Sequence, residues 1–179
     1  IANTRNDSKY EKLLSFFSLV YIPVNYLTFS TSYGTTRSNG ESFYMSPKGL
    51  LNYDLTQQNG YISRSMWKGV EQSFSVDGLF ERKIGYFNTK LKLQYLYESS
   101  YSSFLSGGGN DLGIGGMDVT SVNLSSNQSA SSAIYKSIAN NLAGIVVLDY
   151  KDKYIFDGLV RKDASSLFGS NVRWQTLYR

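Results

Sequence analysis

The amino-acid sequence predicts an all-β protein with long antiparallel strands, joined alternately by short turns and long loops. Three observations lead to this fold class. Apolar and polar residues alternate with period two over long stretches, which is a strand signal. Apolar stripes with helical spacing are hard to find. Tight reversals alternate with long polar segments, as in an outer-membrane barrel, whose turns are short on one side and whose loops are long on the other. We therefore expect part of a large transmembrane β-barrel.

The first strand pair is predicted at about 12–22 and 26–35, with a tight turn at 22–26 that contains Pro23. In the second strand of this pair, Leu27 and Phe29 alternate with small polar residues. The pattern is typical of a strand with one apolar and one polar face.

The second pair is predicted at about 69–81 and 86–98, around a turn at 82–86. Apolar residues of the strand after the turn, such as Leu91 and Leu93, share one side. The opposite side is polar, and in a barrel such a side lines the lumen. Its predicted lumen-lining residues are Asn88, Lys90, Lys92, Gln94 and Glu98.

The third pair is predicted at about 135–149 and 153–163, around a charged turn at 150–153, and a seventh strand starts near Arg173. Tyr154 and Phe156 face one way, whereas Asp157 and Arg161 face the other. Facing an Arg or Lys toward lipid near the bilayer centre costs about 2–4 kcal/mol. We therefore expect Asp157 and Arg161 to point into the lumen.

Long loops are predicted at 35–68 and 99–132, and a third begins near Lys162 and runs past Trp174. Short hairpin strands around Phe43 and 61–66 fit inside the first loop. The second loop holds a glycine run at 107–109. The glycine-aspartate pattern at 107–118 matches a calcium-binding repeat poorly, because a single degenerate turn is not a repeat.

Aromatic residues flank the predicted turns and reappear near the opposite ends of the predicted strands. Rings at both borders of an apolar band form the two girdles of a membrane barrel. The alternative is a secreted or surface β-sandwich whose aromatic residues fill a core. A sandwich has many short strands with turns every ~8–12 residues, so the longer strands here favour the barrel. The residues near the turns are Tyr26, Phe29, Tyr86, Phe87, Tyr150, Tyr154 and Phe156, and those near the opposite strand ends are Tyr33, Tyr95 and Tyr97.

The composition excludes several classes of function. The 179 residues carry a net charge of +4 and contain no His and no Cys, so Ser-His and Cys-His nucleophiles and the usual zinc sites are excluded. The longest apolar stretches, such as 142–148, are too short for a membrane-spanning helix. Lys and Arg are scattered, which argues against a nucleic-acid partner. Possible carboxylate pairs lie on the predicted polar faces, where solvated lumen charges are expected rather than a catalytic pair. We therefore expect no enzyme activity, and we also expect no metal and no cofactor.

One segment near the C-terminal end carries a family resemblance. It runs from Tyr150 through a Lys-Asp-Lys turn into a strand and then a serine-containing loop, and ends at Trp174. The segment resembles a signature of the SusC/RagA-like TonB-dependent outer-membrane transporters of Bacteroidetes. Lys162, Ala164 and Leu167 depart from the family pattern. The matching residues are Arg161, Asp163, Ser165, Ser166, Phe168, Gly169, Arg173 and Trp174.

The resemblance implies a larger protein with a barrel of about 22 strands, an N-terminal plug and a TonB-box peptide. Neither plug nor TonB box is found in 1–179, so this range is expected to be a partial barrel segment of the bacterial outer membrane. The implied function is import of nutrients such as oligosaccharides or peptides, driven through the TonB complex. The implied partners are outer-membrane lipid, a SusD-like lipoprotein and the imported ligand. The alternative, a β-sandwich module, would bind glycan or protein instead.

Overall fold

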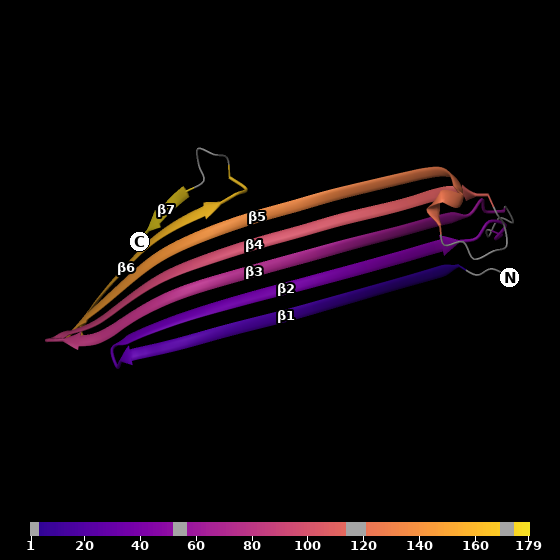
Figure 1. Cartoon of the computed structure of the whole chain (residues 1–179). Coiled ribbons are helices and arrows are strands. Elements are labelled where there is room, and N and C mark those ends of the chain that lie inside the picture. Colours follow the sequence, from indigo (N-terminus) through magenta and orange to yellow (C-terminus); the bar gives the residue numbers. More distant parts are fainter. Residues whose placement is uncertain (1–3, 52–56, 114–120, 169–173) are drawn as a thin grey trace. The chain divides into compact units, whose positions relative to one another are not determined.

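The computed structural model describes residues 4–51, 57–113, 121–168 and 174–179. Seven antiparallel strands form one sheet, in which each strand lies beside its neighbour in sequence (Figure 1). The all-β prediction is therefore confirmed. The elements are β1 (Arg5–Val24), β2 (Leu27–Ser46), β3 (Tyr61–Ile84), β4 (Phe87–Leu112), a short 3-10 helix η1 (Val122–Leu124), β5 (Ser125–Tyr150), β6 (Tyr154–Ser165) and β7 (Trp174–Tyr178).

Tight turns join β1 to β2, β3 to β4 and β5 to β6, as the sequence predicts. Gly85 has φ 61°, a left-handed conformation that glycine adopts without steric cost. Lys151 and Asp152 have φ 55° and 56°. Neighbouring turns are hydrogen-bonded: the Lys151 N–H donates to the Tyr86 carbonyl at 3.0 Å, and the Glu81 N–H donates to the Tyr26 carbonyl at 2.9 Å. The three turns therefore form one connected edge.

The predicted strand bounds are wrong at the ends away from these turns. β4 continues to Leu112 and β5 begins at Ser125, so most of the predicted loop at 99–132 is strand. The predicted loop at 35–68 likewise contains the second half of β2 and the start of β3, which include the hairpin segments expected there. Backbone ladder bonds do not depend on side-chain polarity, which explains why polar segments extend the sheet.

Backbone contacts divide the chain into two compact units. Unit 1 takes the described residues of Ile1–Leu13, Arg37–Val70 and Ser102–Tyr135, and unit 2 takes those of Leu14–Thr36, Glu71–Tyr101 and Lys136–Arg179.

Unit 1 holds a small buried cluster where strand ends meet. Met45, Ile62 and Leu112 are almost fully buried. The Leu112 N–H donates to the Asn59 carbonyl at 2.9 Å, which fixes the end of β4 beside the segment before β3. Partly buried Val122 of η1 packs against the cluster, whose fourth member is Phe43.

Unit 2 exposes most of its apolar side chains. Phe16, Ile155 and Phe156 are 70%, 71% and 63% exposed. A β-sandwich would bury such residues between two sheets, whereas the described strands form one sheet. The alternative of a β-sandwich is therefore not supported. None of the helices among the described residues has the length and apolar character needed to cross a membrane.

Candidate functional site

The register of β5 and β6 sorts their side chains onto two faces. Residues directly opposite in an antiparallel pair share a face. Val147 pairs with Asp157, and Ala143 pairs with Arg161. Leu148 pairs with Phe156, one position along from the Val147–Asp157 pair, so these two side chains point to the other face. Asp157 and Arg161 therefore share the face opposite Phe156, as the sequence predicts. We call the face with Asp157 the polar face and the other the apolar face.

The predicted polar residues of β4 lie on the polar face too. The Asn88 amide donates to Asp149 Oδ2 at 3.4 Å, and Asp149 shares the face of Val147 because successive side chains alternate. The same alternation along β4 brings Lys90, Lys92, Gln94 and Glu98 to this face.

Ion pairs on the polar face join neighbouring strands. Lys92 Nζ lies 3.3 Å from Asp77 Oδ1, and Lys90 Nζ lies 3.7 Å from Glu81 Oε2. Most of these side chains are well exposed, the exception being Asp77 at 18%. Exposed pairs contribute only about 0–1 kcal/mol, so their main consequence is that β3 and β4 present matched charges on one face.

The charges of β6 are also paired on this face. Arg161 Nε lies 2.7 Å from Asp163 Oδ1 on the same strand. Arg179 Nε lies 3.9 Å from Asp157 Oδ2. Arg173, which comes just before β7, lies outside the described residues.

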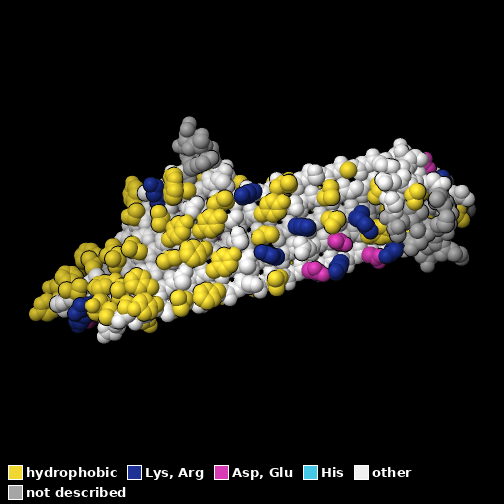
Figure 2. All heavy atoms as spheres, in the orientation of Figure 1, with side chains coloured by type: hydrophobic (Ala, Val, Ile, Leu, Met, Phe, Trp, Pro, Cys, Tyr) yellow, Lys and Arg dark blue, Asp and Glu magenta, His cyan; other side chains and the backbone are white. Residues whose placement is uncertain are grey.

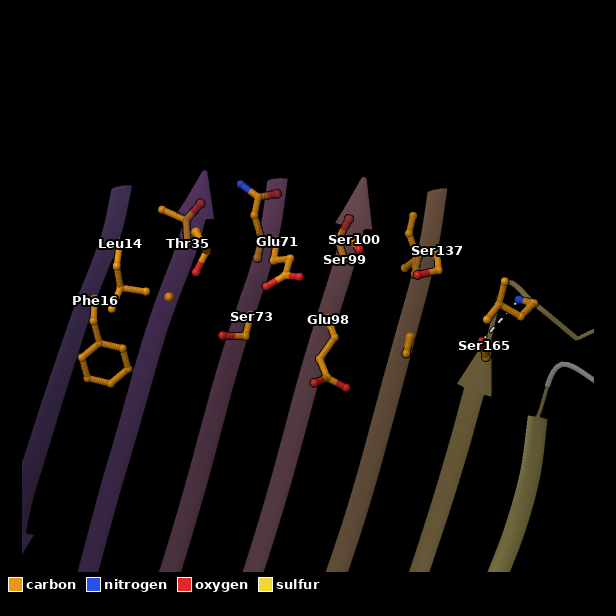
Figure 3. A pocket seen from close by; sticks show the side chains of 16 residues that line it. Leu14, Phe16, Thr35, Glu71, Ser73, Glu98, Ser99, Ser100, Ser137 and Ser165 are labelled. Atoms are coloured by element: carbon orange, nitrogen blue, oxygen red, sulfur yellow. Dashed lines mark hydrogen bonds between the residues drawn. The ribbon is translucent and has the colours of Figure 1, made fainter. Parts of the chain in front are cut away.

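Farther from the turns, the polar face of unit 2 has a hollow of about 480 Å³. Figure 3 shows Leu14 and Phe16 at its β1 side and Glu71 and Glu98 on β3 and β4. Hydroxyl groups supply much of the rest of the lining, so the surface suits water or a polar solute. These groups belong to Thr35, Thr36, Ser73, Ser99, Ser100, Ser137 and Ser165.

The apolar face of unit 2 carries a continuous apolar surface. A groove of about 540 Å³ crosses five strands, from Phe29 on β2 to Val160 on β6. Its lining is almost entirely aliphatic or aromatic and includes Val76, Leu93 and Leu142. Figure 2 shows apolar side chains gathered toward the tight-turn ends of the strands.

A first group of aromatic rings borders this surface at the tight turns. The Tyr26 and Phe80 rings are 5.8 Å apart, centre to centre. The Tyr150 ring lies 4.9 Å from that of Phe87 and 6.4 Å from that of Tyr86. We call these five residues the turn girdle.

A second group lies in mid-strand, since the strands are longer than predicted. The Tyr95 hydroxyl donates to Asn140 Oδ1 at 2.8 Å, and the Gln72 amide donates to the Tyr33 hydroxyl at 3.0 Å. Lys162 Nζ lies 5.2 Å from the ring centre of Trp174. Polar groups at the ends of side chains therefore reappear on the apolar face at this mid-strand level. We call Tyr33, Tyr95 and Trp174 the mid-strand girdle.

The distance between the girdles is comparable to the height of the apolar band of an outer-membrane barrel, and somewhat shorter. Phe87 of the turn girdle and Tyr95 of the mid-strand girdle are eight positions apart on β4. At ~3.3 Å per residue this is about 26 Å along the strand, and about 20 Å after a tilt of ~35–45°. Outer-membrane barrels carry an apolar band of about 25 Å.

The motif serines hold the end of β6. The Ser166 hydroxyl accepts a hydrogen bond from the Ile138 N–H at 2.8 Å, and the Ser166 N–H donates to the Ile138 carbonyl at 2.8 Å. The Leu167 N–H donates to the Ser165 hydroxyl at 3.2 Å. These bonds connect the turn after β6 to β5.

The other motif residues extend this turn. The Phe168 N–H donates to the Ser165 carbonyl at 3.2 Å, and Trp174 pairs with Ala164 at the start of β7. Gly169 lies outside the described residues, as does Arg173. The described part of the motif therefore shapes the β6–β7 connection and forms no catalytic arrangement.

Cation–aromatic pairs at the tight turns were missed in the sequence. Arg82 Cζ lies 4.7 Å from the ring centre of Tyr26, and Lys151 Nζ lies 4.6 Å from that of Tyr86. A sequence signal existed only for Lys151, because it directly follows Tyr150 in its turn, whereas Arg82 and Tyr26 are far apart in the sequence.

Lys9 and Glu11 form an exposed ion pair on β1 in unit 1, with Lys9 Nζ 2.8 Å from Glu11 Oε1. A hydrogen bond to Glu11, reinforced by its charge, raises the pKa of Lys9. The same contact lowers the pKa of Glu11. No group of three or more His, Cys, Asp and Glu among the described residues is arranged to hold a metal ion.

An open antiparallel sheet with one apolar and one polar face is the architecture of a barrel-wall segment. No family model matches the chain, and no curated protein matches it. Solved structures of the RagAB peptide transporter match 98% of the chain. One matches with a TM-score of 0.82 at 17% identity. The RagAB peptide importer matches with 0.83 at 16% identity in the closed-closed state, and with 0.85 at 17% in the open-open state.

The match covers 19–20% of the RagAB chains, so this chain spans about a fifth of their length. At this identity the likeness shows the fold. It confirms the predicted fold class and, at the level of fold, the resemblance to a RagA-like transporter. The matched structures are those of a transporter and not of an enzyme.

Proposed function

We propose that the chain forms part of the wall of a TonB-dependent outer-membrane transporter that imports nutrients. The observation that carries this proposal is the apolar band on one face of unit 2, bordered by aromatic residues on both sides. The opposite face bears ion pairs and hydroxyl groups. A barrel wall between lipid and an aqueous lumen requires this division.

In this proposal the apolar face contacts outer-membrane lipid and the polar face lines the lumen. The β4 residues facing the lumen are Asn88, Lys90, Lys92, Gln94 and Glu98, and the β6 residues are Asp157 and Arg161. Residues 1–179 then serve as a partial barrel segment that supplies no plug.

A peptide is the favoured ligand, because the matched structures are of a peptide transporter. An oligosaccharide is a second ligand that fits the sequence resemblance, because that resemblance is to SusC-like as well as RagA-like transporters. The resemblance also supplies the remaining partners: a SusD-like lipoprotein, and the TonB complex acting through parts of the protein outside this segment.

The division of faces can be tested with single cysteines, since the chain has no native Cys. The variants are Lys92→Cys and Leu93→Cys, made in the full protein that carries this chain. They are assayed in outer-membrane vesicles that are permeabilised so that a water-soluble reagent reaches both sides of the membrane. A charged, water-soluble thiol reagent should modify position 92 at least about tenfold faster than position 93, because a dry environment suppresses the thiolate. Lipid-soluble quenchers should reach only a label at position 93.

Transport needs its own measurement. Deleting the gene should abolish growth on peptides as the sole amino-acid source while leaving growth on free amino acids intact. Equal thiol reactivity at positions 92 and 93 would contradict the barrel-wall proposal. Normal uptake of peptides and of oligosaccharides in the deletion strain would contradict the transport proposal.

A further inference from the structure

Two cations lie over aromatic rings of the turn girdle. Arg82 Cζ is 4.7 Å from the Tyr26 ring centre. Lys151 Nζ is 4.6 Å from that of Tyr86 and 5.3 Å from that of Tyr150. The turns that hold these groups are hydrogen-bonded to their neighbours through the Tyr26 and Tyr86 carbonyls. The rings and cations therefore form a connected group along one edge of unit 2.

The carboxylates near these turns are engaged elsewhere. Glu81 pairs with Lys90, and both Asp149 and Asp152 accept hydrogen bonds from the Asn88 amide. These partners belong to the polar face. Among the described residues, no carboxylate forms an ion pair with Arg82 or Lys151. The apolar side of the turn edge is therefore left with net positive charge.

This edge is also well exposed. Tyr86 and Tyr154 are 67% and 62% exposed, and Phe156 is 63% exposed. Amphipathic rings of this kind sit at the headgroup level of a membrane. A guanidinium or an ammonium held beside them lies at the height of the lipid phosphates, which are the anions that Arg and Lys bind.

We propose that the turn girdle, with Arg82 and Lys151, is a binding site for anionic phospholipid in the leaflet next to the tight turns. This inference rests on the proposed function, since it needs the apolar band to lie in a bilayer. The phosphate of the lipid headgroup binds the unpaired cations, and its acyl chains lie against Phe87 and Phe156. Zwitterionic lipid carries a compensating cation and binds more weakly.

The test uses the full protein that carries this chain, in nanodiscs of phosphatidylethanolamine with a rising fraction of phosphatidylglycerol. Native mass spectrometry counts the phosphatidylglycerol molecules that remain bound. The variants are Arg82→Gln and Lys151→Gln. Each should lower the apparent affinity for phosphatidylglycerol about fivefold, which corresponds to ~1 kcal/mol per cation near a membrane surface.

The matched control is Lys83→Gln. Lys83 is adjacent to Arg82 in β3, so the variant removes the same charge from the opposite face. It should leave phosphatidylglycerol binding unchanged. Equal losses in Lys83→Gln and Arg82→Gln, or no loss in Arg82→Gln and Lys151→Gln, would overturn the lipid site. A protein that inserts normally but shows no lipid preference refutes the site alone, whereas one that fails to insert refutes the proposed function as well.

Discussion

Gly40 illustrates how one residue shapes packing in unit 1. A Cβ at this position would lie 2.1 Å from Nε1 of Trp67. The Trp67 ring also stacks on Tyr10, with ring centres 5.3 Å apart and an angle of 28° between the planes. An aromatic side chain that covers a strand glycine compensates for the side chain that glycine lacks. The indole therefore links β1, β2 and β3 only because position 40 has no side chain.

We expect Gly40→Ala to destabilise the protein by about 1–3 kcal/mol, the usual cost of overpacking. The added methyl group must displace the indole and break its stack on Tyr10. Denaturant unfolding of the full protein in detergent would measure the loss. Gly107→Ala is the matched control, because the nearest atom to its Cβ would be the Ser129 carbonyl oxygen at 3.9 Å. Equal stability of the two variants would contradict this account.

At the scale of elements, the long strands are the main departure from the sequence-based prediction. Residues 99–112 complete β4, and the Ser106 and Ser131 hydroxyls are hydrogen-bonded at 2.8 Å between β4 and β5. We expect amide hydrogens at 99–112 to exchange as slowly as those at 88–98 of the same strand, because both stretches belong to one ladder. Exchange by mass spectrometry would check this. Loop-like exchange at 99–112, more than about a hundredfold faster than at 88–98, would contradict it.

The sequence predicts some elements well for an identifiable reason. Around the tight turns, one strand face is apolar and the other polar, so alternation reveals both the strand and its sides. Alternation assigned Asp157 and Arg161 to the face opposite Phe156, and the register with β5 places them on it, whereas their position in a lumen stays a prediction. Residues 99–112 are mostly serine and glycine, and their few large apolar residues, such as the neighbours Phe104 and Leu105, do not alternate with polar ones, so no period-two pattern marks this stretch as a strand. Contacts between distant segments, such as that of Arg82 with Tyr26, depend on register, which a single sequence does not display.

At the scale of the whole molecule, the sheet is open at β1 and at β7. All residues of β1 are exposed, including Leu14 and Phe16, each 70% exposed. An edge strand of this length presents a row of unpaired backbone groups to other chains. In lipid each such unsatisfied group costs several kcal/mol, so this edge requires a neighbouring strand there.

We therefore expect the isolated 179-residue chain to associate in aqueous buffer, because both the β1 edge and the apolar face of unit 2 lack a covering partner. Size-exclusion chromatography with light scattering should give masses well above the 20.1 kDa of one chain. The full protein in detergent is the control and should remain monodisperse, since its other strands would pair with β1 and β7. Detergent added to the isolated chain covers only the apolar face, so association through the sheet edges should persist. Replacing alternate β1 residues with Pro should reduce this edge association, because Pro lacks the backbone N–H that would pair with another strand. A monodisperse monomer of the isolated chain that unfolds cooperatively in plain buffer would show that the sheet needs no neighbour, and the barrel-wall assignment would fail with it.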